Sequence, residues 1–275
     1  MTRPVFRFGP AVLFCPADRP DRYAKALDRA DAVILDLEDA VGVDRKQDAR
    51  HALATTPLDP ERVIVRLNPA SGPEFEADLA ALARTGYRTV MLAKCEGTED
   101  LVGLEEFEVI PLCETARGVL AAEALAALPN VSALMWGAED LMASTGGTSS
   151  RRPDGGYREI ARYARSRVLL AAAAHGAAAI DAVHLDLADT AGLREEAEDA
   201  AAVGFAATAC VHPDQVAVVR AAYRPSPERV EWAQAVLDAA DGEAGVFAFR
   251  GGMVDGPVLR QAEAVVRLAR ALDSR

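Results

Sequence analysis

The stretch Asp31-Ala-Val-Ile-Leu-Asp-Leu-Glu-Asp-Ala-Val41 combines the two features around which the chain is organised. Residues 32–35 are a short apolar run with two β-branched side chains, which is typical of a strand buried on both faces. Three carboxylates follow within four residues, at Asp36, Glu38 and Asp39. Clustered negative charge at the end of a buried strand is costly unless a cation or a polar site shares it. The stretch therefore predicts a buried strand that ends at a functional site.

Strand and helix patterns alternate on both sides of this stretch. The apolar runs predict strands over residues 11–14, 32–37, 62–67, 89–93, 107–112, 131–136, 177–182 and 206–211. The helical periodicity predicts helices over 21–30, 45–54, 74–84, 99–104, 116–128, 157–174, 193–202 and 213–223. Eight strand-then-helix units predict a closed (β/α)8 TIM barrel, with a doubly wound open sheet as the alternative.

Polar side chains follow these strands, which favours the barrel over the open sheet. They are Asp36 and Glu38, Arg66 and Asn68, Lys94 and Glu96, Glu114, Glu139 and Asp140, His184 and Asp186, and His212. A barrel gathers the carboxyl ends of its strands around one mouth, which is where active sites of this fold lie. Pro225 and Pro227 then mark a boundary between a barrel domain of residues 1–224 and a C-terminal segment of 225–275.

The composition is that of a globular protein rather than of a nucleic-acid or membrane protein. The 275 residues carry a net charge of −12, from 42 acidic and 30 basic side chains, which argues against a general nucleic-acid binder. No apolar run reaches 18 residues and no signal core opens the chain, so we expect no membrane span. Four separated cysteines without a C-x-x-C pair favour a reducing cytoplasm.

The ordered set of motifs closely resembles the HpcH/HpaI aldolase family, in its citrate lyase β-subunit-like branch. The matching segments are FCPADRP at 14–20, VILDLEDAV at 33–41, VRLN at 65–68, LCETARG at 112–118, WGAED at 136–140, CVHP at 210–213 and MVDGP at 253–257. The resemblance implies a magnesium-dependent (β/α)8 enzyme that makes or breaks a C–C bond next to a coenzyme A thioester. It also implies a homotrimer or hexamer in which the C-terminal segment is a helical lid on a neighbouring subunit. One departure is Ala93, where the family often has proline.

Glu114 and Asp140 are the candidate metal ligands. They follow two strands that are neighbours in a barrel, and two carboxylates so placed can share one hard cation. A helix cap at Glu114 and a solvated charge at Asp140 are the structural alternatives. The resemblance assigns both side chains to Mg2+, for which Mn2+ is a possible substitute.

Arg66 and Asp255 are the candidate catalytic residues. The guanidinium of Arg66 can grip a substrate carboxylate or stabilise oxygen charge, and it can also pair with Asp36 or Glu38. Asp255 alone reads as a cap or turn residue. The resemblance raises Asp255 to a catalytic acid/base that is donated to a neighbouring subunit.

The remaining candidates bind or orient the substrate. We expect Asp36, Glu38, Lys94, Gly137 and Ala138 to line the substrate site around Arg66. Arg19 and Lys25, within a matching motif, are candidates for the coenzyme A phosphates, as are Arg151 and Arg152 in a loop; a solvated charged surface is the alternative for each. Asp39 is expected to cap the turn into the second helix, and His184 and His212 to be hydrogen-bonded structural residues.

The expected function is therefore cleavage of a malyl-CoA or citramalyl-CoA type thioester to acetyl-CoA and a 2-oxo acid, or the reverse condensation. Three alternatives remain open. The chain could be the β subunit of a multi-subunit citrate lyase that cleaves a citryl thioester to oxaloacetate. It could be a pyruvate aldolase that uses no thioester, or a non-enzymatic protein that binds oxo acids and coenzyme A.

Overall fold

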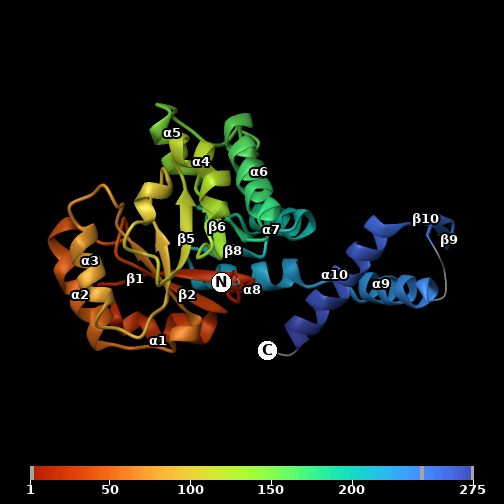
Figure 1. Ribbon diagram of the computed structural model, residues 1–275, viewed down its shortest axis with the longest axis horizontal. Helices are drawn as coiled ribbons and strands as arrows, with labels where there is room; N and C mark the ends of the chain where they lie inside the picture. The colour runs from red at the N-terminus through yellow and green to blue at the C-terminus, as the bar shows by residue number, and fades with distance from the viewer. Residues whose placement is uncertain (1–2, 242–244, 274–275) are drawn as a thin grey trace. The chain divides into compact units, whose positions relative to one another are not determined.

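A computed structural model describes residues 3–241 and 245–273 of the chain. It divides into two compact units, Met1–Val219 and Arg220–Arg275. The first unit is built on eight parallel strands that close into a barrel in sequence order (Figure 1). The strands are β1 (Ala11–Pro16), β2 (Ala32–Asp36), β3 (Val63–Leu67), β4 (Thr89–Leu92), β5 (Glu108–Cys113), β6 (Ala133–Trp136), β7 (Ala178–Asp181) and β8 (Ala207–Cys210). The predicted (β/α)8 barrel is confirmed, and the open sheet is wrong because β1 pairs with β8.

Helices connect these strands on the outside of the barrel. They are α1 (Pro20–Arg29), α2 (Lys46–Thr55), α3 (Phe75–Leu82), α4 (Ala116–Ala127), α5 (Ala138–Ser144), α6 (Glu159–Ala174), α7 (Thr190–Val203) and α8 (Pro213–Tyr223). Short 3-10 turns cover η1 (Val43–Arg45), η2 (Pro60–Arg62) and η3 (Thr98–Leu101). None of the helices in the described ranges is long and apolar enough to cross a membrane.

Alternate strand residues fill the barrel interior, as the apolar runs predict. The cluster includes Val12, Ile34, Ile64, Met91, Ile110, Met135 and Ile180. β2 is buried along its whole length, so its opposite side chains pack against the helix layer. At about 25 cal/mol per Å2 of apolar surface removed from water, this layered burial is the main force that holds the strand ends in place.

One predicted helix differs from the structure. The segment predicted as a helix over 99–104 is only the turn η3, which Gly103 follows at φ +89°. The structure also shows two features that the apolar pattern does not give. Helix α5 begins directly after β6. The buried face of α3 includes Asp78, whose carboxylate accepts bonds from Arg50 Nε at 2.7 Å and from the Asn68 backbone N–H at 2.9 Å.

The second unit contains α9 (Pro227–Ala240), a hairpin of β9 (Phe247–Phe249) and β10 (Gly252–Val254), and α10 (Gly256–Asp273). β10 is not among the strands predicted from the apolar runs, since the adjacent glycines Gly251 and Gly252 are typical of a link. Arg250 and Gly251 form the two-residue turn at φ +47° and +80°, as a type I′ hairpin requires. The unit has its own core of Ala233, Val236, Val254, Ala262 and Val266.

Candidate functional site

Five charged side chains meet at the carboxyl ends of neighbouring strands. Asp36 ends β2 and stands in register with Arg66 on β3. Lys94 follows β4, Glu114 follows β5, and Asp140 lies in the first turn of α5 after β6. The barrel thus brings together residues that lie up to about a hundred positions apart in the sequence, because parallel strands end at the same rim.

Arg66 is held by a buried pair of carboxylates. Its Nε and Nη2 donate to the two oxygens of Asp36 at 2.7 and 2.5 Å, and its Nη1 lies 3.0 Å from Glu38 Oε2. The Asp36 side chain is fully buried, and the guanidinium carbon lies 4.8 Å from the centre of the Phe14 ring. Burial alone would lower the pKa of Arg66, but Asp36 and Glu38 raise it. Arg66 therefore stays charged in a fixed orientation.

The carboxylate of Glu38 can accept a further hydrogen bond. Burial raises the pKa of its carboxyl group, against the opposing effects of Arg66 and Lys94. Oε2 is buried and has no hydrogen-bond partner among the described residues, although it lies near Arg66 Nη1. The ion pair with Arg66 compensates the charge of Oε2, and a water or substrate donor would add the hydrogen bond that this atom lacks.

Lys94 joins the carboxylates around the mouth. Its backbone N–H donates to Glu114 Oε1 at 3.0 Å. Its ammonium group forms an ion pair with Glu38 and lies 3.0 Å from Asp39 Oδ2 and 3.4 Å from Asp140 Oδ1. Burial would lower the pKa of Lys94, but Glu38 and Asp39 raise it, so the side chain is a cation.

Glu114 and Asp140 form an incompletely compensated acidic pair. Glu114 is 4% exposed, whereas the side chain of Asp140 is 35% exposed toward solvent. Burial raises the pKa of Glu114 to about 8, and the charge of Asp140 adds to this shift. A hard divalent cation would reverse that penalty, since Mg2+ takes one or two protein carboxylates and fills its other positions with water and substrate. No group of three or more His, Cys, Asp or Glu side chains forms a metal-binding cluster in residues 3–241 and 245–273.

Gly137 gives Glu114 its space. A Cβ at Gly137 would lie 2.8 Å from Glu114 Oε2 and 3.0 Å from Glu114 Cβ, closer than real contacts allow. Ala138 follows as a buried residue in the first turn of α5, so residues 137 and 138 lie against the carboxylate pair. This contact explains why a glycine stands between β6 and α5.

We expect Gly137→Ala to weaken metal binding at this site by about tenfold, because the added methyl group must displace the Glu114 carboxylate. Calorimetric titration of the variant with Mn2+ measures the effect. Gly86→Ala is a matched control, since a Cβ at Gly86 would meet nothing within 4 Å. Unchanged Mn2+ affinity in Gly137→Ala would show that the position of Glu114 does not govern the metal.

A second network, which the sequence analysis did not identify, supports the loop after β2. Lys46 is buried, and its ammonium donates to the carbonyls of Leu37 and Glu38 at 2.7 and 2.8 Å and to Asn68 Oδ1 at 2.8 Å. Lys46 lies on the inner stripe of α2 with Ala49 and Leu53, and a lysine on such a stripe is the signal that could have found it. These hydrogen bonds from Lys46 hold the loop that carries Glu38 in place.

The comparisons with known proteins show the family of the chain. The family model for HpcH/HpaI aldolase/citrate lyase matches residues 10–213. The chain belongs to the HpcH/HpaI aldolase/citrate lyase family. A "citrate lyase subunit beta-like protein" of Mycobacterium tuberculosis is 56% identical over 261 residues, which are 95% of this chain and 96% of that protein. The mitochondrial citramalyl-CoA lyase of Mus musculus is 33% identical over 299 residues, covering 96% of this chain and 87% of that enzyme.

A solved structure of this family carries ligands. The CitE protein from Mycobacterium tuberculosis in complex with magnesium, acetoacetate and coenzyme A has a TM-score of 0.92 and 56% identity to this chain. The match covers 96% of this chain and 98% of that one. The expected family is thus confirmed over both units.

Three of the residues that we expect to contact coenzyme A form ion pairs within the chain. Arg19, at the start of α1, donates to Asp21 at 3.0 and 3.1 Å, and Lys25 is exposed further along that helix. The loop arginines are paired too: Arg151 forms an ion pair with Glu196, and Arg152 lies 2.7 Å from Glu159. The geometry therefore does not rank these four residues, and their role stays a prediction.

One prediction about the acidic stretch is wrong. Asp39 does not cap the turn into α2; its exposed carboxylate contacts Lys94 instead. Asp36 instead closes the turn directly after β2, where its carboxylate accepts the backbone N–H groups of Glu38 at 2.8 Å and Ala40 at 3.2 Å. The same carboxylate also accepts from Arg66. 

His184 is a hydrogen-bonded buried residue, as expected: its Nδ1 lies 2.9 Å from Glu196 Oε2, and its carbonyl accepts from Gln215. His212 is half-buried, and its Nδ1 accepts from the backbone N–H of Asp214 at 3.3 Å.

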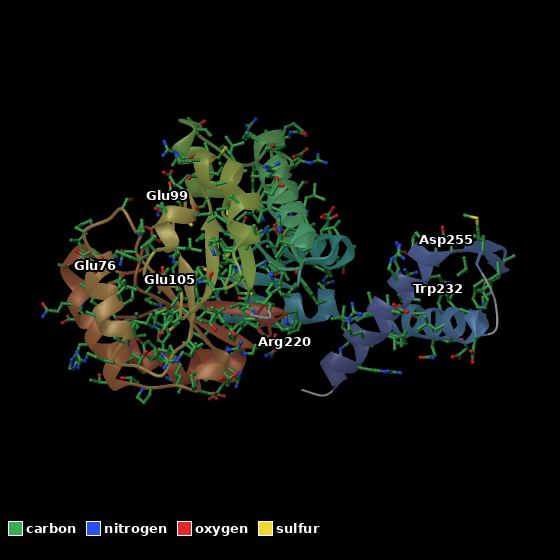
Figure 2. The ribbon with its side chains drawn as sticks, in the orientation of Figure 1. Glu76, Glu99, Glu105, Arg220, Trp232 and Asp255 are labelled. Atoms are coloured by element: carbon green, nitrogen blue, oxygen red, sulfur yellow. The ribbon has the colours of Figure 1, made fainter. Side chains whose placement is uncertain are left out.

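Asp255 lies in the second unit, at the start of α10 (Figure 2). Its Oδ1 accepts from the backbone N–H of Val258 at 3.3 Å, so it does cap the helix. The cap also positions a partly exposed carboxylate directly after the β9–β10 hairpin.

Proposed function

We propose that this protein is a Mg2+-dependent carbon–carbon lyase of the malyl-CoA or citramalyl-CoA type. It cleaves a 3-hydroxyacyl-CoA to acetyl-CoA and a 2-oxo acid, or runs the condensation in reverse. The observation that carries the proposal is the half-open carboxylate pair of Glu114 and Asp140 beside the fixed cation Arg66. The magnesium, acetoacetate and coenzyme A bound by the 56% identical relative support it.

Each residue of the mouth has a role in this reaction. Glu114 and Asp140 would hold Mg2+ (or Mn2+ as a substitute), which supplies Lewis-acid polarisation of a carbonyl oxygen when it is bound. Arg66 stabilises the negative charge that develops on oxygen as the C–C bond breaks, since Asp36 and Glu38 hold its guanidinium in place.

The neighbouring groups shape the substrate site. Gly137 and Ala138 leave room for the oxo acid next to Glu114. Asp36, Glu38 and Lys94 orient the charged groups around it. Arg19 and Lys25 contact the phosphates of coenzyme A near the start of α1.

We further propose that Asp255 moves the proton at the acetyl carbon. In cleavage a base takes the proton of the 3-hydroxyl, the C–C bond breaks, and Asp255 protonates the acetyl-CoA enolate; in condensation Asp255 removes the proton of the acetyl carbon and the new alkoxide takes up a proton. Residues 225–275 form the lid that brings Asp255 to the site of a neighbouring copy in a homotrimer or hexamer. Support comes from the half-exposed position of Asp255 in a unit with its own core, which can act as a separate body. We also propose a cytoplasmic location, which suits the four free, buried cysteines.

A β subunit of citrate lyase, acting on a citryl thioester to give oxaloacetate, is the second candidate. The citrate lyase subunit beta-like name of the Mycobacterium tuberculosis relative favours it. Both candidates use the same barrel mouth, so substrate chemistry must separate them.

A thioester panel tests the proposal. Purified protein with Mg2+ is incubated with malyl-, methylmalyl-, citramalyl- and citryl-CoA, and products are identified by mass. The lyase proposal expects an acyl-CoA and a 2-oxo acid from a malyl- or citramalyl-type thioester, and no products with excess EDTA. Turnover of citryl-CoA alone would favour the second candidate. Thermal stabilisation by 2-oxo acid and Mg2+ without turnover of any thioester would instead indicate a binding protein.

A further inference from the structure

Lys94 contacts carboxylates from three different connections of the barrel. Its side chain reaches Glu38 and Asp39 after β2 and Asp140 after β6, while its backbone N–H reaches Glu114 after β5. A single residue between β4 and β5 therefore holds both proposed metal ligands. The backbone amide of Lys94 holds Glu114, and its ammonium group holds Asp140.

An uncommon backbone conformation makes this double contact. Lys94 has φ +49°, in the left-handed region that residues other than glycine seldom adopt. The N–H groups on both sides hold it there: Ala93 donates to the carbonyl of Leu67 at 3.3 Å, and Cys95 donates to that of Leu112 at 3.2 Å. Strain of this kind persists only where the surroundings fix it, and it often accompanies a functional role.

The charges explain what the ammonium does there. Arg66 is committed to Asp36 and Glu38, with two hydrogen bonds to the former. Within the part of the chain that the structure describes, Lys94 is the cation that contacts Asp140, at 3.4 Å. A divalent cation shared by Glu114 and Asp140 would repel that ammonium, since like charges at such distances oppose each other through a partly desolvated mouth. The ammonium and the metal thus compete for Asp140.

We propose that Lys94 is a positioning residue that serves as a resident counter-ion of the metal site. Its ammonium compensates Asp140 and Glu38 before the metal binds and yields Asp140 to the metal, while its backbone N–H keeps Glu114 in place. This inference rests on the proposed metal-ligand roles of Glu114 and Asp140. It implies that the charge of Lys94 lowers the affinity of the free protein for a divalent cation.

The test measures Mn2+ binding to the full chain by calorimetry, without any thioester. Lys94→Asn removes the charge, and asparagine tolerates the left-handed backbone. We expect Lys94→Asn to bind Mn2+ about tenfold tighter than the wild type, and Lys94→Arg, which keeps the charge, to bind within about threefold of it. A purely structural role predicts weaker binding in Lys94→Asn, so equal or weaker affinity in the folded variant overturns the proposal.

Two further measurements separate the possible failures. Glu114→Gln should abolish Mn2+ binding; if it does not, the proposed metal site itself is wrong and the counter-ion role falls with it. If Glu114→Gln abolishes binding but Lys94→Asn does not tighten it, only the counter-ion role is wrong. Should Lys94→Asn fail to fold, crystals of the wild type grown with and without Mn2+ decide. The Lys94–Asp140 contact must be lost with the metal bound, and its persistence contradicts the proposal.

Discussion

Replacing Glu114 with Gln is expected to lower lyase turnover by at least about a thousandfold. The amide keeps the shape of the side chain but removes half of the charge that the carboxylate pair offers to a divalent cation. Loss of a metal that polarises a reacting oxygen costs several kcal/mol of transition-state stabilisation, and each 1.36 kcal/mol is tenfold in rate. Initial rates at saturating thioester and several Mg2+ concentrations measure the effect.

Glu139→Gln is the matched control for this substitution. Glu139 lies next to Asp140 in the first turn of α5, but it is exposed and accepts a hydrogen bond from Ser150 Oγ at 2.6 Å. Its variant should retain turnover within a few-fold of the wild type. Equal losses in Glu114→Gln and Glu139→Gln would indicate a general effect of charge rather than a metal ligand.

Glu114→Gln should also change how the stability of the metal-free protein depends on pH. Burial first, and Asp140 second, raise the pKa of Glu114 from 4.5 to about 8 in the metal-free protein. Between these values the unfolded chain is ionised while the folded chain keeps the proton, so stability falls as pH rises from about 4.5 to about 8. The loss is on the order of a few kcal/mol.

Thermal unfolding of metal-free protein at pH 5 and pH 8 measures this loss. Glu114→Gln should remove most of it and be the more stable protein at pH 8. Added Mg2+ should raise the melting temperature of the wild type more at pH 8 than at pH 5. A wild-type stability that does not depend on pH across this window would contradict the assigned burial of Glu114.

Replacing Asp255 with Asn is expected to lower turnover by about a hundredfold to ten-thousandfold, the range for loss of a positioned general acid or base. The amide still accepts a hydrogen bond, so it should preserve the cap on the Val258 N–H and the fold of the second unit. Metal affinity should not change, because Asp255 is not among the proposed ligands. Single-turnover kinetics and Mn2+ titration of the same preparation give both quantities.

Asp238→Asn controls for the loss of a carboxylate in the same unit. Asp238 is exposed on α9, where it accepts from Gln234 at 2.9 Å. Mixing the Asp255→Asn and Glu114→Gln proteins then tests donation between copies. If subunits exchange, activity should partly return in the mixture, because one copy supplies the acid and another the metal ligands. Near-wild-type turnover of Asp255→Asn would remove Asp255 from the mechanism.

The apolar runs predicted the barrel because burial of apolar side chains is the dominant force in folding, and the sequence shows directly which side chains are apolar. All eight strands begin and end within about two residues of the expected positions. The misplaced elements depend on backbone geometry instead. The helix expected at 99–104 is cut short before Gly103, and β10 forms because Arg250 and Gly251 adopt a left-handed turn. Neither backbone conformation follows from hydrophobic pattern.

In the site too, contacts that follow from the strand order were predictable, and contacts that depend on local backbone geometry were not. Asp36 and Arg66 end adjacent strands, so their pairing followed from topology. The contact from the Lys94 backbone to Glu114 did not, since the direction of a single N–H depends on φ. Asp39 was misassigned because three carboxylates in four residues give no order of burial; the structure buries Asp36 and exposes Asp39.

The most direct test of the central claim is cleavage of citramalyl-CoA by the purified wild-type protein, followed by mass spectrometry with and without Mg2+. The account predicts stoichiometric acetyl-CoA and pyruvate in the presence of Mg2+, no products after chelation, and recovery when Mg2+ or Mn2+ is added back. Malyl-CoA, with glyoxylate as the product, is run in parallel to cover the other thioester of the proposed class. Products that form equally well in excess EDTA, or no C–C cleavage of either thioester by folded, metal-loaded protein, would contradict it.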